Sequence, residues 1–337
     1  MQNPKLKPLF LLLFSCLVFQ TAIGQDKTPT LSFFEKADTF HPRRFYTIAG
    51  IGTVIYGSAS IGLWNEWYKN YPIGKFHFFN DWEEWKQVDK AGHFFTSYIY
   101  ANYCFEGALW TGMNRKKAMW TGALVGTGLQ LTVEVMDGFS EKWGFSMGDL
   151  AFNTAGTLLF MGQELAWQEQ RIKMKVSSHA VDYGAFPTLT SQDATQTMSI
   201  SERVQNLYGT SFAELLLKDY NAQTNWASFN IWSFLPEREK SSFPKWLNLA
   251  VGYGGGNLFG GFGNQWTTDD GATFVLSSTD YPRYRRYMLS LDIDLSQIKT
   301  RKKWLNTLFK TLNWIKIPSP TLEFNSKGEI RGYPIYW

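Results

Sequence analysis

The 337-residue sequence has few charged residues and almost no cysteine. Lys, Arg, Asp and Glu together make up 18% of the chain, below the roughly 25% of a typical soluble domain. The net charge of +4 is small and evenly spread, so the sequence does not indicate nucleic-acid binding. The two cysteines are Cys16 and Cys104. If the chain is cut after Cys16, no intramolecular disulfide can form, and packing must stabilise the fold.

Aromatic side chains, by contrast, are abundant. They make up 17% of the chain and include 15 Trp and 27 Phe. Because Trp and Tyr favour the boundary between lipid and water, this composition indicates an envelope or membrane setting. We therefore expect membrane lipid to be a partner of the protein.

The N-terminus has the layout of a secretory signal peptide. Lys5 and Lys7 precede an apolar run at residues 8–19, and Ala22 and Gly24 are small residues before a possible cut. This layout predicts a signal peptide over residues 1–24 and export to the cell envelope. Cleavage before Cys16, with lipid attached to that cysteine, is the alternative.

Four apolar stretches follow, at residues 46–64, 92–113, 118–133 and 150–163. We predict that residues 25–172 form an antiparallel bundle of about four apolar helices. The first and third stretches contain repeated glycines, which predict close helix–helix approach as in membrane bundles. A membrane-embedded or membrane-docked bundle is the first interpretation, and a buried soluble bundle is the alternative.

The rest of the chain has a different pattern. Residues 173–205 are polar and predict a linker. In residues 206–337, segments such as "LNLAVGY" and "RYMLSLDID" alternate apolar and polar residues, which is typical of half-buried strands. Residues 300–317 predict an amphipathic helix. The fold class is therefore α+β, with a small antiparallel sheet and one amphipathic helix after the bundle.

Polar residues in the apolar stretches form two groups. Asp89, His93 and Ser97 lie four residues apart, and so share one face of a helix. The second group comes from the end of the third apolar stretch and the start of the fourth, where a Ser146 N-cap is predicted. Its members are Glu134, Asp137, Ser146, Asp149 and Asn153. Because ionisable groups in an apolar bundle need partners, we expect the two groups to converge.

Three interpretations of this convergence remain open. The first is a structural network with Asp89 and Ser146 as helix caps. The second is a site for Mg²⁺, Mn²⁺ or Zn²⁺; the candidate ligands are Asp89, His93, Glu134, Asp137 and Asp149. The third is a serine-hydrolase triad of Asp89, His93 and Ser97. The candidate catalytic residues over all interpretations are Asp89, His93, Ser97, Glu134, Asp137, Asp149 and Asn153.

The segments "DKAGHFFTSY" and "EVMDGFSEKWGFSMGDLAFNTAG" resemble those of the YfiM-like periplasmic lipoproteins, a domain of unknown function. They are also distantly similar to the VanZ-like membrane proteins. The segments after the helices look like the long form of the YfiM-like family in Bacteroidetes-type bacteria. The resemblance implies an envelope location and a helical core but no activity. It places motif positions at Asp89, Lys90, His93, Ser97, Glu134, Asp137, Ser146, Asp149 and Asn153.

The sequence therefore predicts an exported, non-enzymatic envelope protein with a membrane-associated bundle and a buried polar network. The alternative is a metal-assisted, membrane-associated hydrolase that acts on a lipid or cell-wall precursor. A third possibility is an interaction module, in which residues 329–337 add a strand to an envelope or outer-membrane protein.

Overall fold

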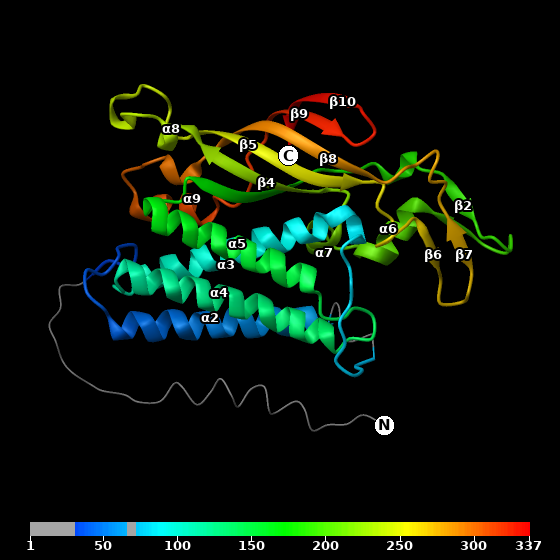
Figure 1. Cartoon of the computed structure of the whole chain (residues 1–337), viewed down its shortest axis with the longest axis horizontal. Coiled ribbons are helices and arrows are strands. Elements are labelled where there is room, and N and C mark those ends of the chain that lie inside the picture. The colour runs from blue at the N-terminus through cyan, green and yellow to red at the C-terminus, as the bar shows by residue number, and fades with distance from the viewer. Residues whose placement is uncertain (1–30, 66–71) are drawn as a thin grey trace.

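The computed structural model describes residues 31–65 and 72–337 (Figure 1). The predicted signal peptide and Cys16 lie outside the described residues. Within those residues the chain forms eight α-helices and a six-stranded antiparallel sheet. Figure 1 shows the sheet above two layers of long helices. The mixed helical and sheet fold is confirmed, whereas the domain boundaries stay a prediction.

The four apolar stretches lie in the four long helices. Pro42, whose fixed φ suits the first turn, begins α2, and the Asn114 side chain caps α4 by accepting from the Lys117 N–H at 2.9 Å. Buried Tyr98, Phe105 and Phe160 belong to the core that joins the last three of these helices. The long helices are α2 (Pro42–Leu63), α3 (Val88–Trp110), α4 (Arg115–Gly138) and α5 (Met147–Trp167).

The glycine prediction is right for part of α4 and wrong for α2. A Cβ on Gly122 would lie 2.5 Å from the Ala101 carbonyl oxygen, and one on Gly126 would lie 2.7 Å from the Ala101 nitrogen. These glycines let the backbones of α3 and α4 approach closely. In the described part of the chain, a Cβ on any of the four α2 glycines would meet no atom within 4 Å. Helix α2 therefore lies on the outside.

The six strands run in the order β1-β4-β5-β8-β9-β10, and every neighbouring pair is antiparallel. They are β1 (Ile172–Ser178), β4 (Gln223–Asn230), β5 (Leu247–Gly256), β8 (Tyr284–Ile293), β9 (Ser319–Asn325) and β10 (Ile330–Tyr336). The five strands from β4 onward match the predicted alternating segments. Strand β1 falls inside the predicted polar linker, because its polar side chains find partners within the sheet.

Shorter elements complete the chain. Residues 200–218 form two short helices rather than one, because Gly209 between them has a φ of +91°. The predicted amphipathic helix is shorter than expected, because Ile315 instead bridges to Val176 of β1. The helical elements are η2 (Glu84–Gln87), η3 (Tyr183–Ala185), α6 (Ile200–Tyr208), α7 (Phe212–Lys218), α8 (Ile231–Phe234), η4 (Arg238–Lys240), η5 (Leu295–Gln297) and α9 (Lys303–Thr311). Two hairpins pair β2 (Thr188–Thr190) with β3 (Thr197–Ser199) and β6 (Gln265–Thr267) with β7 (Thr273–Val275).

The large sheet curls around a polar interior. The hydroxyls of Thr224 in β4 and Tyr336 in β10 lie 3.0 Å apart, although three strands separate β4 from β10 in the sheet order. Inside the curl, the Lys175 ammonium lies 2.7 Å from Asp292, which also accepts a 2.6 Å hydrogen bond from Ser228. These pairings meet the condition under which charged groups can be buried. The strands are half buried as predicted, but the buried half is largely polar.

Candidate functional site

The site is built around Lys90, in the first turn of α3. Its side chain is fully buried, and its Nζ lies 2.6 Å from Asp81 Oδ2 and 2.6 Å from Asp149 Oδ1. Asp89 is more distant, at 3.5 Å. Asp81 comes from the segment before α3 and Asp149 from the start of α5. One ammonium therefore joins three parts of the chain.

The predicted Ser146 cap is confirmed and has a second role. The Asp149 N–H donates to Ser146 Oγ at 3.0 Å, so Ser146 is the N-cap at which α5 begins. The Ser146 hydroxyl donates in turn to Asp81 Oδ1 at 2.6 Å. The cap of α5 is thus tied to the carboxylate that binds Lys90. Asp89 does not cap α3, because it lies within the first turn and the N-cap position is Gln87.

His93 lies one turn beyond Asp89 and faces the other helices. Its Nδ1 is 3.3 Å from Glu134 Oε1 and 3.2 Å from Asn153 Oδ1. Its Nε2 is 3.7 Å from Asp149 Oδ1 and 3.8 Å from Asp89 Oδ1. The imidazole therefore lies among side chains from α3, α4 and α5, as the predicted convergence requires.

Two amide side chains, Asn153 and Gln130, border the cluster next to α4. Asn153 donates to Glu134 Oε1 at 3.0 Å and accepts from Gln130 at 2.9 Å. Glu134 is 1% exposed, yet its Oε2 has no hydrogen-bond partner among the described residues. On the sheet side, the Tyr220 hydroxyl donates to Asp89 Oδ1 at 2.8 Å.

Acidic groups outnumber cations in the cluster. The carboxyl groups of Asp81, Glu84, Asp89, Glu134 and Asp149 are opposed by Lys90 and His93, and Arg283 also acts on Glu84. This excess shifts several pKa values. Burial, followed by the charges of Asp89 and Asp81, raises the pKa of Glu84 to about 7. Burial alone would lower the pKa of His93, but the surrounding carboxylates outweigh it and raise the pKa to about 9.

Burial is also the first cause that raises the pKa values of Asp149 and Glu134. Asp81 is different, because hydrogen bonds from its neighbours and the Lys90 charge outweigh burial and lower its pKa. The surrounding carboxylates thus favour the charged form of His93, whereas burial favours the protonated forms of Glu84, Asp149 and Glu134. Proton binding reduces the excess of negative charge.

Two of the predicted site residues do not take part in the contacts described above. Ser97 is buried, and its hydroxyl donates to the Phe94 carbonyl on its own helix at 3.1 Å. The Asp89–His93–Ser97 triad is therefore not assembled by these hydrogen bonds. Asp137 is half-buried one turn beyond Glu134. The predicted residues that the structure does bring together are Asp89, Lys90, His93, Glu134, Ser146, Asp149 and Asn153.

Four contributors were not predicted from the sequence: Asp81, Glu84, Gln130 and Tyr220. Gln130 lies four residues before Glu134, so helical spacing could have identified it. Residues 144–148 also have the Gly-x-Ser-x-Gly spacing of a nucleophile elbow. However, this serine is Ser146, which is buried and bonded to Asp81 rather than exposed as an elbow nucleophile is.

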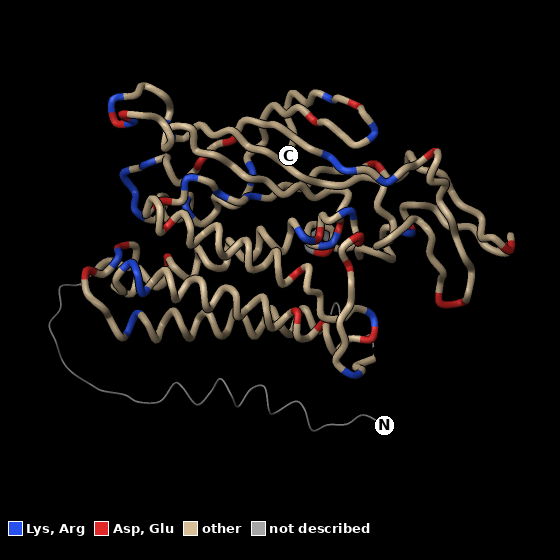
Figure 2. Tube along the Cα trace, viewed as in Figure 1, with Lys and Arg blue, Asp and Glu red and all other residues tan. Residues whose placement is uncertain are grey.

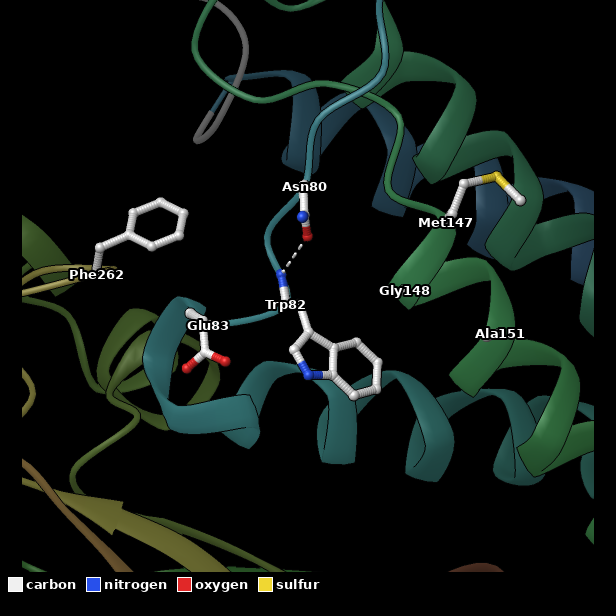
Figure 3. Close-up of a pocket in the computed structure, with 7 residues that line it drawn as sticks. All are labelled: Asn80, Trp82, Glu83, Met147, Gly148, Ala151 and Phe262. Carbon is white, nitrogen blue, oxygen red and sulfur yellow. Dashed lines mark hydrogen bonds between the residues drawn. The ribbon is translucent and has the colours of Figure 1, made fainter.

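A groove of about 680 Å³ lies next to the cluster. Figure 3 shows Trp82 pointing toward Ala151 of α5, with Phe262 across the groove. Gly148 separates the groove from the cluster, because a Cβ there would lie 3.1 Å from Lys90 Cε. The ionisable residue lining the groove is Glu83, which is not one of the cluster residues. The groove therefore approaches the cluster without containing it.

Three ligand-type side chains are close enough to share a cation. Asp89, His93 and Asp149 each offer one ligand atom, and these three atoms lie within 4.8 Å of one another. Carboxylate and imidazole donors suit divalent metals. However, the Lys90 ammonium already lies against Asp149, and a charged His93 cannot donate a lone pair. A metal would have to displace the Lys90 ammonium and the His93 proton.

Residues 77–161 match the model of one protein family. This segment contains α3, α4 and most of α5. That family is described as "Predicted periplasmic lipoprotein (DUF2279)". No curated protein and no solved structure matches the chain. The more specific likeness to YfiM-like and VanZ-like proteins stays a prediction. The chain is an exported protein of the cell envelope, and the matched segment is similar to a periplasmic lipoprotein family.

Proposed function

We propose that this chain is a non-enzymatic envelope protein in which a buried polar network holds α3, α4 and α5 in register. The observation that carries this proposal is the position of the Lys90 ammonium. It is fully buried and lies 2.6 Å from each of two carboxylates, Asp81 and Asp149, on separate elements. Removing one member of such a set leaves an uncompensated buried charge. The network therefore favours one arrangement of the three helices.

The same proposal places the helical body in or on a membrane, with α2 as its lipid-contacting helix. Among the described residues, α2 is the helix long and apolar enough to cross a bilayer, and none of its most apolar window is buried. Val54 is 68% exposed and Ile61 is 66% exposed. Lipid contact would remove these side chains from water.

The experiment compares wild type with His93→Ala and Asp149→Asn after extraction in detergent. Asp269→Asn is the matched control, because Asp269 is exposed in the β6–β7 hairpin. Metal content and thermal unfolding are measured on all four proteins. A structural network predicts early melting of the two cluster variants, an unchanged control, and no stoichiometric metal in wild type.

A second candidate is a metal-assisted hydrolase acting on a lipid or cell-wall precursor. Two observations favour it: the Asp89, His93 and Asp149 donor atoms within 4.8 Å, and the unpartnered Glu134 Oε2 beside them. A metal there could lower the pKa of a bound water, and a carboxylate could accept its proton. Stoichiometric metal in wild type that is lost in both variants would replace the structural proposal with this one.

A protein partner could add a strand to the sheet at β10. This strand is last in the sheet order, and Ile335 near its end is 74% exposed. Deleting residues 329–337 would also remove Tyr336, which is bonded to Thr224 inside the sheet. Ile335→Lys is therefore the cleaner variant. It should release an envelope partner captured by crosslinking while the thermal unfolding stays the same.

A further inference from the structure

The large sheet exposes its apolar face over three neighbouring strands. Val251 of β5, Leu289 of β8 and Leu322 of β9 are cross-strand neighbours, so they lie on the same face. They are 49%, 40% and 48% exposed. With the exposed residues that flank them, they form what we name the outer apolar patch. It consists of Leu249, Val251, Tyr287, Leu289, Leu291, Leu322 and Phe324.

Polar contacts inside the sheet fix this orientation. Asp292, which follows the patch residue Leu291 in the sequence, is fully buried and bonded to Lys175 and Ser228. The buried Lys316 ammonium donates to the Leu291 carbonyl at 2.7 Å. A one-residue register slip would move every side chain of a strand to the opposite face. It would break these contacts, so the apolar face is held outward.

The helices cover only the first strands on this face. Met174 of β1 and Ala227 of β4 pack with α3, and a Cβ on Gly255 would lie 3.0 Å from Val88 of α3. The outer apolar patch lies farther along the sheet and stays exposed. Contiguous apolar side chains on one exposed face of a sheet are typical of a surface that contacts a protein or a membrane.

The chemistry of the patch fits hydrocarbon. None of its seven residues is charged, and the neighbouring Asp292 and Glu323 are buried on the other face of their strands. Figure 2 shows further Lys, Arg, Asp and Glu residues in the loops that flank the sheet. The patch side of β5, from Leu247 to Tyr253, spans about 20 Å at roughly 3.3 Å per residue. The apolar band of membrane-inserted sheets is about 25 Å tall, with polar residues inside.

The position of α2 favours lipid over a second copy of the chain. Figure 1 shows α2 in the lower layer of helices and the sheet above both layers, so α2 and the sheet lie on opposite sides of α3 and α5. A closed two-fold dimer buries one patch on each copy. A bilayer surrounding the protein contacts both surfaces.

We propose that the outer apolar patch contacts the hydrocarbon of a lipid bilayer, so that the sheet and not only α2 enters the membrane. This inference rests on the membrane association proposed above. It assigns the patch a partner of defined chemistry, the acyl chains. The polar interior of the sheet then remains shielded from lipid by its own strands.

Spin labels can test this in the full chain reconstituted into vesicles of phosphatidylethanolamine and phosphatidylglycerol. The background is Cys104→Ser, after checking that it takes up no label. Labels are placed by Leu289→Cys in the patch, by Val54→Cys in α2 and by Asp269→Cys in the exposed β6–β7 hairpin. Collisions with oxygen, which dissolves in lipid, are compared with collisions with a water-soluble nickel complex.

The proposal predicts that the label at position 289 collides often with oxygen and rarely with the nickel complex. The label at position 269 should collide often with the nickel complex, because it stays in water. Nickel collisions at position 289 while position 54 is lipid-exposed would overturn the inference and leave membrane association through α2 intact. Shielding of position 289 from both probes would also overturn it, because protein would then cover the patch. Failure of all labelled proteins to enter vesicles would reject both proposals.

Discussion

Helices α2 and α4 are both long, apolar and rich in glycine, yet glycine has different roles in them. In α4, Gly122 and Gly126 face the backbone of α3 with no room for a methyl group. In α2, Gly52 and the other glycines face open space among the described residues. Repeated glycine thus lies at a close helix–helix contact in α4 and on an uncovered surface in α2.

The difference extends to polar residues. Glu134 of α4 joins the buried cluster with His93 and Asn153. In α2, the one buried residue is Arg44, at the start of the helix, where it donates to the Trp110 carbonyl at 3.1 Å. Helices α3, α4 and α5 are therefore specified by both close backbones and ion pairs. Most of the length of α2 is fixed by neither, which suits a helix whose surroundings are lipid.

Removing the Lys90 ammonium, which joins α3 to α5, should have the largest effect on stability. Lys90→Met leaves Asp81 and Asp149 buried without their cation. We expect a loss of about 3–5 kcal/mol in the free energy of unfolding, measured by urea unfolding in detergent. Lys117→Met, at an exposed position of α4, should change it by less than about 0.5 kcal/mol. Equal stability of the two variants would show that the cluster does not hold the helices together.

The stability of these helices should also depend on pH. The pKa of His93 is raised to about 9 from an ordinary 6.5. A raised pKa in the folded state means that the stabilisation is complete below pH 6.5 and is lost as pH rises through 9. The pKa of Asp149 is also raised, so its deprotonation likewise lowers the stability of the folded state as pH rises. At most about 3 kcal/mol is expected from His93.

This pH dependence can be measured by thermal unfolding between pH 6 and 10. His93→Gln should be less stable than wild type at pH 6 and should show a flatter profile between pH 6.5 and 9. The exposed variant Asp269→Asn should follow wild type. Parallel profiles for wild type and His93→Gln would mean that folding does not raise the pKa of His93.

The sequence was sufficient for the long helices and most strands, because their periods of 3.6 and 2 are local properties. It was not sufficient for the direction of the sheet. The alternation in "RYMLSLDID" places Leu289 and Leu291 on one face, but alternation does not tell which face is buried. The buried polar face depends on Lys175 of β1 and on Lys316, which precedes β9, and both are distant in sequence from the β8 residues that they contact. Strand β1 was missed for the same reason.

The candidate site shows the same division. Helical spacing predicted that Asp89 and His93 share a face, and the capping pattern predicted the contact between Ser146 and Asp149. Asp81 and Tyr220 were missed, because each comes from an irregular segment whose position only the tertiary fold determines. Lys90 was identified as a motif position, but its role as the centre of the ion pairs was not predicted.

Adding a methyl group tests the close approach in α4. In Gly122→Ala, the new Cβ would lie 2.5 Å from the Ala101 carbonyl oxygen and 2.9 Å from Phe105 Cβ. Overpacking of this kind costs about 1–3 kcal/mol, which we expect as a lower urea midpoint. Gly128→Ala on the same helix meets no described atom within 4 Å and is the matched control. A stabilised Gly122→Ala would mean that α3 and α4 are farther apart than described.

The smallest effect is expected in α2. Ala favours a helix over Gly by up to about 1 kcal/mol, and Gly52 has no described atom within 4 Å of an added Cβ. Gly52→Ala should therefore slow amide hydrogen exchange in α2, measured by mass spectrometry in detergent, and leave the urea midpoint of the other helices unchanged. Faster exchange with a change in oligomeric state would show that this face of α2 packs closely against another protein. The contrast with α4 would then disappear, because both helices would use glycine for close packing, one within the chain and one between chains.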